Sequence, residues 1–283
     1  MIDYLPSLLV LIVFALHVRG ERRAAVLTGR RRSREARQRA RIFYAGLLTI
    51  LIALCAPLDS LADRLFWVHM IQHLLLLVVA APLIVLGQPW LSIWRPLPLR
   101  LRRVVAGSAV RAGWLAPLRG TFRALSRPAG AWLAFNLALI IWHLPGPYDL
   151  TLRNTNVHIA EHATFLAAGI LFWSQVAAVA PSPNTLSIPQ RVGYVASASV
   201  VNIGLSMYLA FAQHPLYNVY ATLAHRPGGI SALADQQMGA GFMWTAGDMP
   251  FAIAIALLVQ RWLAANEAAT EALGPRVEVS APR

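Results

Sequence analysis

Long apolar stretches alternate with short polar ones along most of the chain. Seven of them approach the roughly 20 residues that an α-helix needs to cross the hydrocarbon core of a membrane. They cover residues 2–18, 42–58, 65–86, 129–144, 157–180, 192–212 and 241–263. This pattern predicts an all-α, polytopic membrane protein, built as a bundle of seven transmembrane helices.

The composition agrees with a membrane protein. The 283 residues are 57% hydrophobic and only 13% charged, against about 25% charged residues in a soluble domain. No linker divides the apolar part, so we expect a single membrane domain over residues 1–263. The first stretch is interpreted as an uncleaved span because its arginines follow it. The polar tail at 264–283 is predicted to be disordered and cytoplasmic.

The positive charge is concentrated in two connections. Net charge is +13 and all 25 basic residues are arginine, with ten at 19–41 and eight at 95–127. The positive-inside rule places both connections, about 19–41 and 90–128, in the cytoplasm. Seven spans then put the N-terminus outside and the C-terminus in the cytoplasm. Arginines that flank apolar spans set topology, so no nucleic acid partner is expected.

The second basic connection allows two interpretations. Residues 98–125 mix arginine with leucine, valine and tryptophan. A helix lying on an anionic inner leaflet has this composition, and so has a solvated basic loop. Membrane lipid is an expected partner in the first case.

Histidines mark the outer side of the predicted bundle, where seven of the eight fall. His69 and His73 form one i, i+4 pair and His158 and His162 form another, so each pair lies on one stripe of a helix. His143 ends the fourth predicted span. Ionisable groups inside a bilayer are costly and call for a functional explanation. These five histidines predict a metal site.

Several other side chains are possible participants. Glu161 stands three residues after His158 and is expected to orient its imidazole from outside the ligand set. His17 is excluded because it falls at the inner end, and His225 lies in the last external connection. Further candidates at or near the outer side are Cys55, Met70, Asp248, Met243 and His214.

The same residues are compatible in part with two other metal chemistries. The sequence HIAEH at 158–162 fits H-x-x-E-H, in which two histidines bind zinc and the glutamate activates water. Peptidases with that motif are soluble and need a further carboxylate ligand. Haem held by two histidines requires one histidine from each of two facing helices, which an i, i+4 pair on one helix does not supply.

Four sequence blocks together resemble one known family. They are FWVHMIQHLLL at 66–76 with APL at 81–83 and GQP at 87–89; WHLP at 142–145 with YD at 148–149; HIAEH at 158–162 with LFW at 171–173; and DQQMG at 235–239 with MW at 243–244. Their order and spacing resemble the polytopic, caa3-type CtaG family of cytochrome c oxidase assembly factors. This family is distinct from the single-span copper chaperones that share its name.

The resemblance implies a multi-pass protein of the bacterial inner (plasma) membrane that matures haem-copper oxidases by handling copper on the outer side. An oxidase subunit is then the client. The motif positions that it carries over are His69, His73, His143, His158, His162, Asp235 and Gln237. The segment 235–237 is either a functional block or the N-cap of the seventh helix. His214 and His225 lie outside the matching blocks.

The leading hypothesis is a copper site, at the outer ends of the third and fifth spans, that loads an oxidase subunit. Imidazoles suit Cu(I) and Cu(II), and Met70, Met243 and Cys55 would assist with Cu(I). The rival is a zinc-dependent intramembrane hydrolase in which Glu161 or Asp248 is the base. Copper transport is a third hypothesis, although it needs polar groups deeper in these spans, where the sequence is apolar.

Overall fold

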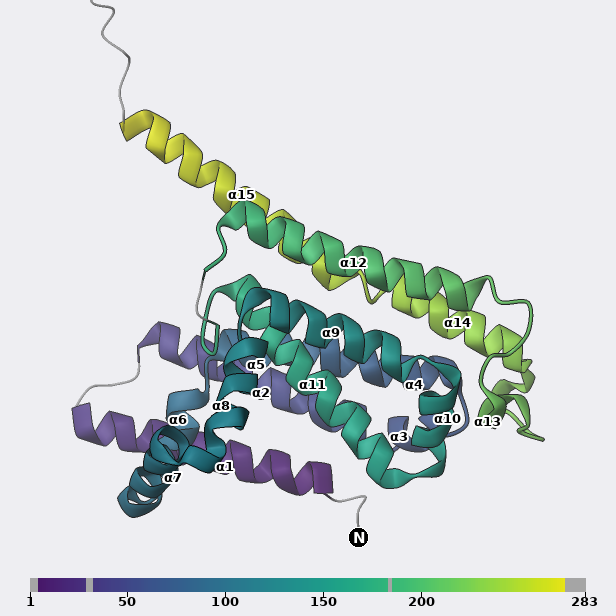
Figure 1. Ribbon diagram of the computed structural model, residues 1–283, viewed down its shortest axis with the longest axis horizontal. Helices are drawn as coiled ribbons and strands as arrows, with labels where there is room; N and C mark the ends of the chain where they lie inside the picture. The colour runs from purple at the N-terminus through teal and green to yellow at the C-terminus, as the bar shows by residue number, and fades with distance from the viewer. Residues whose placement is uncertain (1–4, 29–32, 183–184, 273–283) are drawn as a thin grey trace, which may run out of the picture.

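A computed structural model describes residues 5–28, 33–182 and 185–272, and every element in these ranges is helical. Figure 1 shows the arrangement. The helices are α1 (Leu5–Thr28), α2 (Arg34–Leu54), α3 (Leu58–Ala62), α4 (Phe66–Leu74), η2 (Leu75–Ala80), α5 (Ala81–Gly87), α6 (Trp90–Trp94), α7 (Leu99–Arg111), η3 (Gly113–Leu115), α8 (Ala116–Leu125), α9 (Pro128–Trp142), α10 (Pro145–Arg153), α11 (Thr155–Ala177), α12 (Ile188–Ala210), α13 (Asn218–Ala221), η4 (Pro227–Gly229), α14 (Ala232–Thr245) and α15 (Met249–Ala272).

The long helices lie side by side, roughly along one axis, and the chain runs back and forth between the two ends of the bundle (Figure 1). Each apolar stretch singled out in the sequence falls largely within one of these helical segments. The segments are α1, α2, the continuous run α4–η2–α5, α9, α11, α12, and the pair α14–α15. The all-helical prediction is therefore confirmed.

The number of membrane spans differs from the prediction. Within the described residues, three helical runs are long and apolar enough to cross a membrane: Phe66–Gly87, Ile188–Ala210 and Ala232–Glu271. A fourth follows if Gly113–Leu125 and Pro128–Trp142, which meet at 87°, count as one span. Three or four thus stand where seven were predicted. The physical reason is polarity, since α1 and α2 include arginines and α11 includes two histidines and a glutamate.

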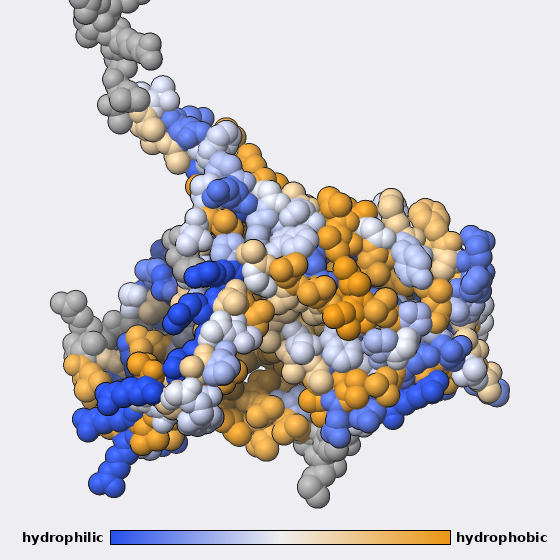
Figure 2. Space-filling view, viewed as in Figure 1, coloured by the Kyte–Doolittle hydropathy of each residue, from blue (hydrophilic) through white to orange (hydrophobic). Residues whose placement is uncertain are grey.

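The two ends of the bundle have different character. Helices α6, α7 and α8 lie at the end where α1 stops and α2 begins, and α3, α10 and α13 lie at the opposite end (Figure 1). Both arginine-rich segments are therefore at one end, and 98–125 is mostly helical, as α7 and α8. Figure 2 shows hydrophobic residues over the middle of the visible face and hydrophilic ones towards both ends.

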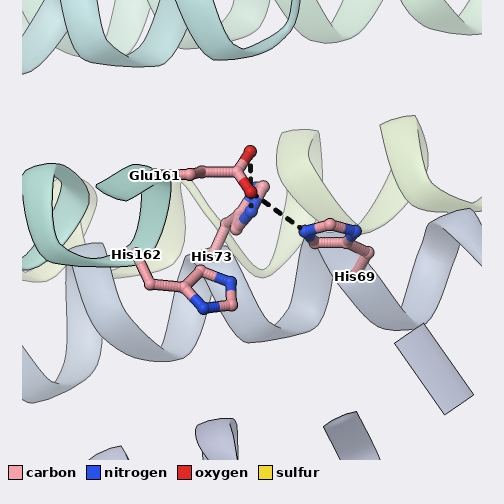
Figure 3. Close-up of side chains that lie close together, drawn as sticks. All are labelled: His69, His73, Glu161 and His162. Carbon is pink, nitrogen blue, oxygen red and sulfur yellow. Dashed lines mark ion pairs between the residues drawn. The ribbon is translucent and has the colours of Figure 1, made fainter. Parts of the chain in front are cut away.

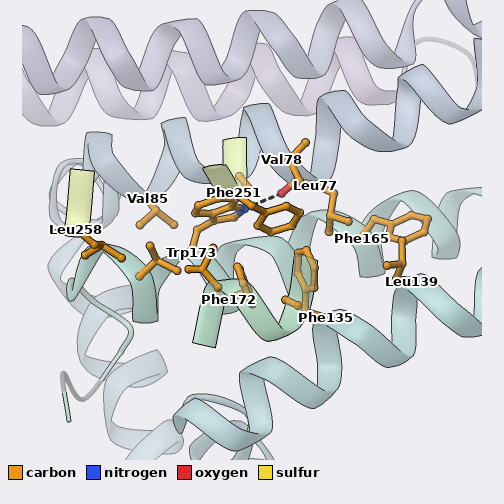
Figure 4. Close-up of a cluster of buried hydrophobic side chains, with 14 residues drawn as sticks. Leu77, Val78, Val85, Phe135, Leu139, Phe165, Phe172, Trp173, Phe251 and Leu258 are labelled. Atoms are coloured by element: carbon orange, nitrogen blue, oxygen red, sulfur yellow. Dashed lines mark hydrogen bonds between the residues drawn. The ribbon is translucent and has the colours of Figure 1, made fainter. Parts of the chain in front are cut away.

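Aromatic side chains fill the core around α11. Phe135, Phe172 and Phe251 stack or meet edge to face, with ring centroids 4.2–6.0 Å apart. The Trp173 indole N–H donates to the Leu77 carbonyl at 2.9 Å, which Figure 4 shows within this cluster. Such burial of aromatic rings accounts for much of the packing energy of a helical core.

The Leu77 carbonyl belongs to a π-helical segment, η2, that directly follows the first histidine pair. A π turn interrupts the regular hydrogen-bond ladder, and such turns are frequent at functional sites. Gly169 of α11 lets the backbones approach here, because an added Cβ would lie 2.8 Å from the Ala81 side chain and 3.1 Å from the Leu77 carbonyl. Helix α11 is thereby held tightly against the helix that carries His69 and His73.

Helix boundaries extend past the predicted spans. Helix α1 continues to Thr28 and α2 starts at Arg34, so much of the basic connection at 19–41 is helical. Helix α15 continues to Ala272, inside the tail predicted to be disordered. The remainder of that tail, 273–283, lies outside the described residues.

Candidate metal centre

The first histidine pair lies at the start of α4, and the start of this helix is fixed from a distance. Its N-cap residue, Leu65, has no side chain that can accept a hydrogen bond. Asp235 of α14 supplies the missing acceptors, since its carboxylate oxygens accept from the backbone N–H groups of Phe66 and Trp67, each at 3.0 Å. Arg226 lies 3.4 Å from the same carboxylate. A carboxylate at a helix N-terminus is also favoured by the helix dipole.

The second pair lies at the start of α11, where the cap is local. The Asn154 side-chain oxygen accepts from the N–H groups of Asn156 and Val157 at 2.9 and 3.3 Å. This cap begins the helix just before His158. Residues i, i+3 and i+4 then share one stripe, which carries His158, Glu161 and His162.

The two stripes face one another. The Nε2 atom of His69 lies 3.5 Å from Oε2 of Glu161, and Nε2 of His73 lies 3.4 Å from Oε1. Figure 3 shows Glu161 reaching between the two α4 histidines with His162 beside them. His69, His73, Glu161 and His162 each offer a ligand atom, and these atoms all lie within 4.8 Å of one another. We call these four residues the histidine–glutamate centre.

The polar atoms of the centre are buried and lack ordinary partners. Its residues are at most 8% exposed. Within the described chain, no hydrogen bond reaches Nε2 of His69, either nitrogen of His73, Nε2 of His162 or either oxygen of Glu161. Buried polar groups are almost always satisfied. Separations of 3.4 and 3.5 Å are long for a hydrogen bond but match two ligands of one tetrahedral ion, which lie about 3.3–3.6 Å apart. The residues therefore fit a metal ion.

A tyrosine determines which nitrogen of His69 faces the centre. The Tyr220 hydroxyl donates to the Ala62 carbonyl and lies 3.2 Å from Nδ1 of His69. Burial raises the pKa of the Tyr220 phenol well above its usual value, so the hydroxyl keeps its proton. Since that proton is committed to Ala62, Nδ1 of His69 donates to the tyrosine oxygen. The lone pair of the neutral imidazole is then on Nε2, facing Glu161.

His158 lies at the edge of the centre. Its ring centroid is 5.1 Å from that of His69 and 4.3 Å from that of His162. His158 and His162 also line an apolar groove of about 440 Å³ between α1, α2 and α11. A hollow in the surface of Figure 2 marks this region. The apolar groove therefore reaches the edge of the histidine–glutamate centre.

His143 lies on the other side of His73. It follows the last residue of α9, and its ring centroid is 5.8 Å from that of His73. Its Nε2 atom contacts the sulfur of Met70 at 3.3 Å. All five histidines predicted as ligands are therefore gathered around one point, although His143 and His158 lie outside the four-residue centre.

Most of the other predicted participants lie away from the histidine–glutamate centre, and Met243 is the exception. Asp248 accepts hydrogen bonds from Ser199 and Asn202 at 2.8 and 3.3 Å. Cys55 lies near Ser7, 3.2 Å from its hydroxyl. Gln237 is exposed and donates to the Ala210 carbonyl, and His214 and His225 are exposed as well. Met243 is buried and lines a small cavity with Met70, His73 and His143.

Two predicted roles are corrected by these contacts. Segment 235–237 is not the N-cap of its own helix, because Ser231 caps α14 by accepting from the Ala234 N–H at 3.1 Å. Asp235 instead caps α4. Glu161 was expected to orient His158, and its oxygens face His69 and His73.

Two residues that support the site could not be identified from the sequence pattern. Tyr220 stands in a connection without any recognisable motif. Asp149 belongs to one of the four family-like blocks, yet its role is seen only in the structure, where it accepts from the N–H groups of Asn218 and Val219 at 3.2 Å. This contact anchors α13, which carries Tyr220, next to α10.

Fold and site together define a helical membrane protein with a buried histidine–carboxylate cluster at one end. The chain belongs to the cytochrome c oxidase caa3 assembly factor family (Caa3_CtaG), which matches residues 23–265. The resemblance seen in the sequence blocks is therefore confirmed.

The chain is also similar to mycobacterial proteins described as uncharacterized. One from Mycobacterium bovis is 26% identical over 234 residues, which cover 80% of this chain and 35% of the relative. One from Mycobacterium leprae is 23% identical over 226 residues, which cover 78% and 33%. This chain thus spans about a third of the length of these relatives. No solved structure matches it.

Proposed function

We propose that this chain takes part in cytochrome c oxidase assembly by holding copper at the histidine–glutamate centre and passing it to an oxidase subunit. The single observation that carries the proposal is the convergence of four buried ligand atoms from α4 and α11 within 4.8 Å. The family membership supplies the oxidase as client. Three imidazoles and a carboxylate form a borderline donor set that suits Cu(II) and Zn(II).

The centre is proposed to face the outer side of a bacterial inner membrane, as part of a multi-pass protein with its N-terminus outside. The support is the distribution of charge. The arginine-rich segments lie at the end of the bundle opposite α3, α10 and α13, and the centre lies near α3 and α10 (Figure 1). By the positive-inside rule the arginine end is cytoplasmic.

Copper analysis of the purified protein tests the proposal. The double variant His69→Ala/His73→Ala and the variant Glu161→Gln are loaded with copper in detergent, and the bound metal is measured by mass spectrometry. We expect both the double variant and Glu161→Gln to lose the bound metal, because each removes ligands of the centre. The copper content of the oxidase in cells should fall with both variants.

Exposed histidines provide the matched control. The variant His214→Ala changes a histidine that lies outside the centre, so copper binding and oxidase maturation should stay at the wild-type level. Unchanged copper content in His69→Ala/His73→Ala, together with undiminished oxidase maturation, would refute the proposal.

The competing hypotheses find less support. A catalytic zinc site keeps one position for water, whereas four protein atoms converge here, and Asp248 is held by Ser199 and Asn202. Tightly held zinc with hydrolytic activity would favour the hydrolase. Copper transport needs polar groups further along the helices, and η2, which follows the first pair, contains only leucine, valine and alanine.

A further inference from the structure

A contact between a sulfur atom and an imidazole lies next to the histidine–glutamate centre. Nε2 of His143 and Sδ of Met70 are 3.3 Å apart. Both residues are buried, with 3% and 0% of their surface exposed. Met70 lies on α4, one residue after His69, and His143 comes from the end of α9. We call these two residues the methionine–histidine pair.

In this contact, Nε2 of His143 and Sδ of Met70 face each other with lone pairs and without a hydrogen between them. Nδ1 of His143 lies 2.6 Å from the Leu139 carbonyl, and a carbonyl oxygen only accepts, so Nδ1 carries the proton. A neutral imidazole then has its lone pair on Nε2, and a thioether has no hydrogen to donate. A doubly protonated imidazole would remove the conflict only by adding a charge to a buried position, which is costly.

The end of α9 fixes the direction of this lone pair. Leu139 lies in the last turn, where carbonyl groups are left without partners along the helix. The His143 ring bonds to one of them, and the Tyr217 hydroxyl donates to the His143 carbonyl at 2.9 Å. With both the ring and the backbone held, Nε2 is directed at Met70.

The pair has the spacing and the space for an ion. Two ligands of one tetrahedral ion, a nitrogen and a sulfur, lie about 3.5 Å apart. A cavity of about 10 Å³ is lined by Met70, His73, His143 and Met243, among other residues. That volume accommodates about one particle of the size of water.

We propose that the methionine–histidine pair is a second metal site, which binds Cu(I). A thioether is a soft ligand and selects Cu(I), whereas the carboxylate of Glu161 favours harder ions. The second site rests on the copper handling proposed above and adds a ligand set of different preference. His73 lies between the two sites, with Nε2 3.4 Å from Glu161 and its ring centroid 5.8 Å from that of His143. The imidazole of His73 thus separates an ion bound at one site from the other site.

Cu(I) binding by the full-length protein in detergent tests this assignment. Under reducing, oxygen-free conditions, Cu(I) is titrated against bicinchoninate, and X-ray absorption shows whether sulfur is bound to copper. Met70→Leu keeps the side-chain volume and should weaken Cu(I) binding by about tenfold or more and remove the sulfur signal. Met207→Leu changes a methionine of α12 that does not line this cavity, and it should retain both.

A second measurement needs no substitution. In protein labelled with selenomethionine, the copper–sulfur signal should be replaced by copper–selenium, which also excludes Cys55 as the source. Oxygen or nitrogen scattering alone in the labelled protein would overturn the second site, as would unchanged Cu(I) affinity in Met70→Leu.

Comparison of two variants shows which of the two proposed sites is wrong. Glu161→Gln should lose Cu(II) but retain Cu(I) and its sulfur signal. Met70→Leu should bind Cu(I) more weakly, without the sulfur signal, and should retain Cu(II). If Glu161→Gln leaves Cu(II) binding unchanged, the histidine–glutamate centre is refuted. If Met70→Leu leaves Cu(I) binding unchanged while Glu161→Gln loses Cu(II), only the second site is refuted.

Discussion

Buried tyrosine hydroxyl groups determine which nitrogen of the His69 imidazole faces the histidine–glutamate centre. Tyr220 bonds to both Ala62 and His69, and Tyr148 lies 3.5 Å from the Tyr220 oxygen. Burial raises the pKa of both phenols well above the usual value, so both stay protonated. Partners of this kind fix the tautomer of a ligating histidine, and their loss weakens metal binding.

Tyr220→Phe should therefore weaken metal binding at the histidine–glutamate centre by about 10- to 100-fold. The reason is that Nδ1 of His69 loses its acceptor, so the proton is no longer held away from Nε2. A Cu(II) competition titration measures the effect. Tyr217→Phe removes another buried hydroxyl, bonded to the His143 carbonyl, and should change Cu(II) affinity less than about twofold. Equal affinities for wild type and Tyr220→Phe would refute this role.

At this scale the sequence predicted which histidines come together but not how the side chains are oriented. The i, i+4 spacing correctly placed each pair on one stripe, since that follows from helix geometry. The rotation of α11 about its own axis depends on packing against other helices, so the direction of Glu161 was predicted wrongly. Tyr220 was missed because its contact with His69 spans 151 residues of sequence.

Contacts between helices hold the elements in register. The start of α4 depends on Asp235 of α14, and Arg226 accompanies this carboxylate. Hydrogen bonds to a charged group contribute about 1.5–3 kcal/mol each. This capping fixes the position of α4 along the bundle axis, and with it the position of both of its histidines.

Asp235→Asn should lower the free energy of unfolding by about 1.5–3 kcal/mol, because an amide offers one acceptor oxygen where the carboxylate offers two. Denaturant unfolding in mixed micelles measures the loss. Gln237→Ala changes an exposed neighbour on the same helix and should stay within about 0.5 kcal/mol of wild type. A loss of the same size in both variants would contradict the capping role.

Element positions were predictable from apolar stretches, whereas their ends were not. Hydropathy shows where the apolar residues stop. Arginine and alanine are good helix formers, so α1 and α15 continue well past that point. The N-cap of α4 was not predictable because its acceptor lies on a different helix.

On the scale of the whole molecule, the arginine-rich segments and the histidine–glutamate centre lie at opposite ends of the bundle. The arginine-rich helices α7 and α8 lie away from α10 and α13 (Figure 1). Both Ser108 of α7 and Thr222, which follows α13, are exposed. These two positions therefore report on the orientation proposed for the membrane.

Labelling with a membrane-impermeant maleimide should distinguish the two ends. In a Cys55→Ala background, Thr222→Cys should react in intact cells stripped of their outer layers, and Ser108→Cys should react only after the membrane is opened. The reverse pattern would place the histidine–glutamate centre on the cytoplasmic side and refute the proposed orientation. Reaction of Ser108→Cys after lysis controls for its accessibility.

The count of spans was the weakest prediction at this scale. Apolar length alone predicted seven spans, whereas three or four helical runs in the described part of the chain combine that length with low charge. The residues that lower the hydropathy of α11 include His158, Glu161 and His162. The polar residues of the proposed site thus make their helix harder to recognise as a span.

The cap on α4 also bears on how the protein is made. Asp235 follows Phe66 by 169 residues, and Tyr220 also lies far downstream of His69. While the chain is being synthesised, α4 and both histidine pairs emerge before either of these supports exists. A nascent or truncated chain that ends before α13 therefore contains all five histidines but lacks the groups that position them. The proposed metal binding is therefore expected only after synthesis has passed α14.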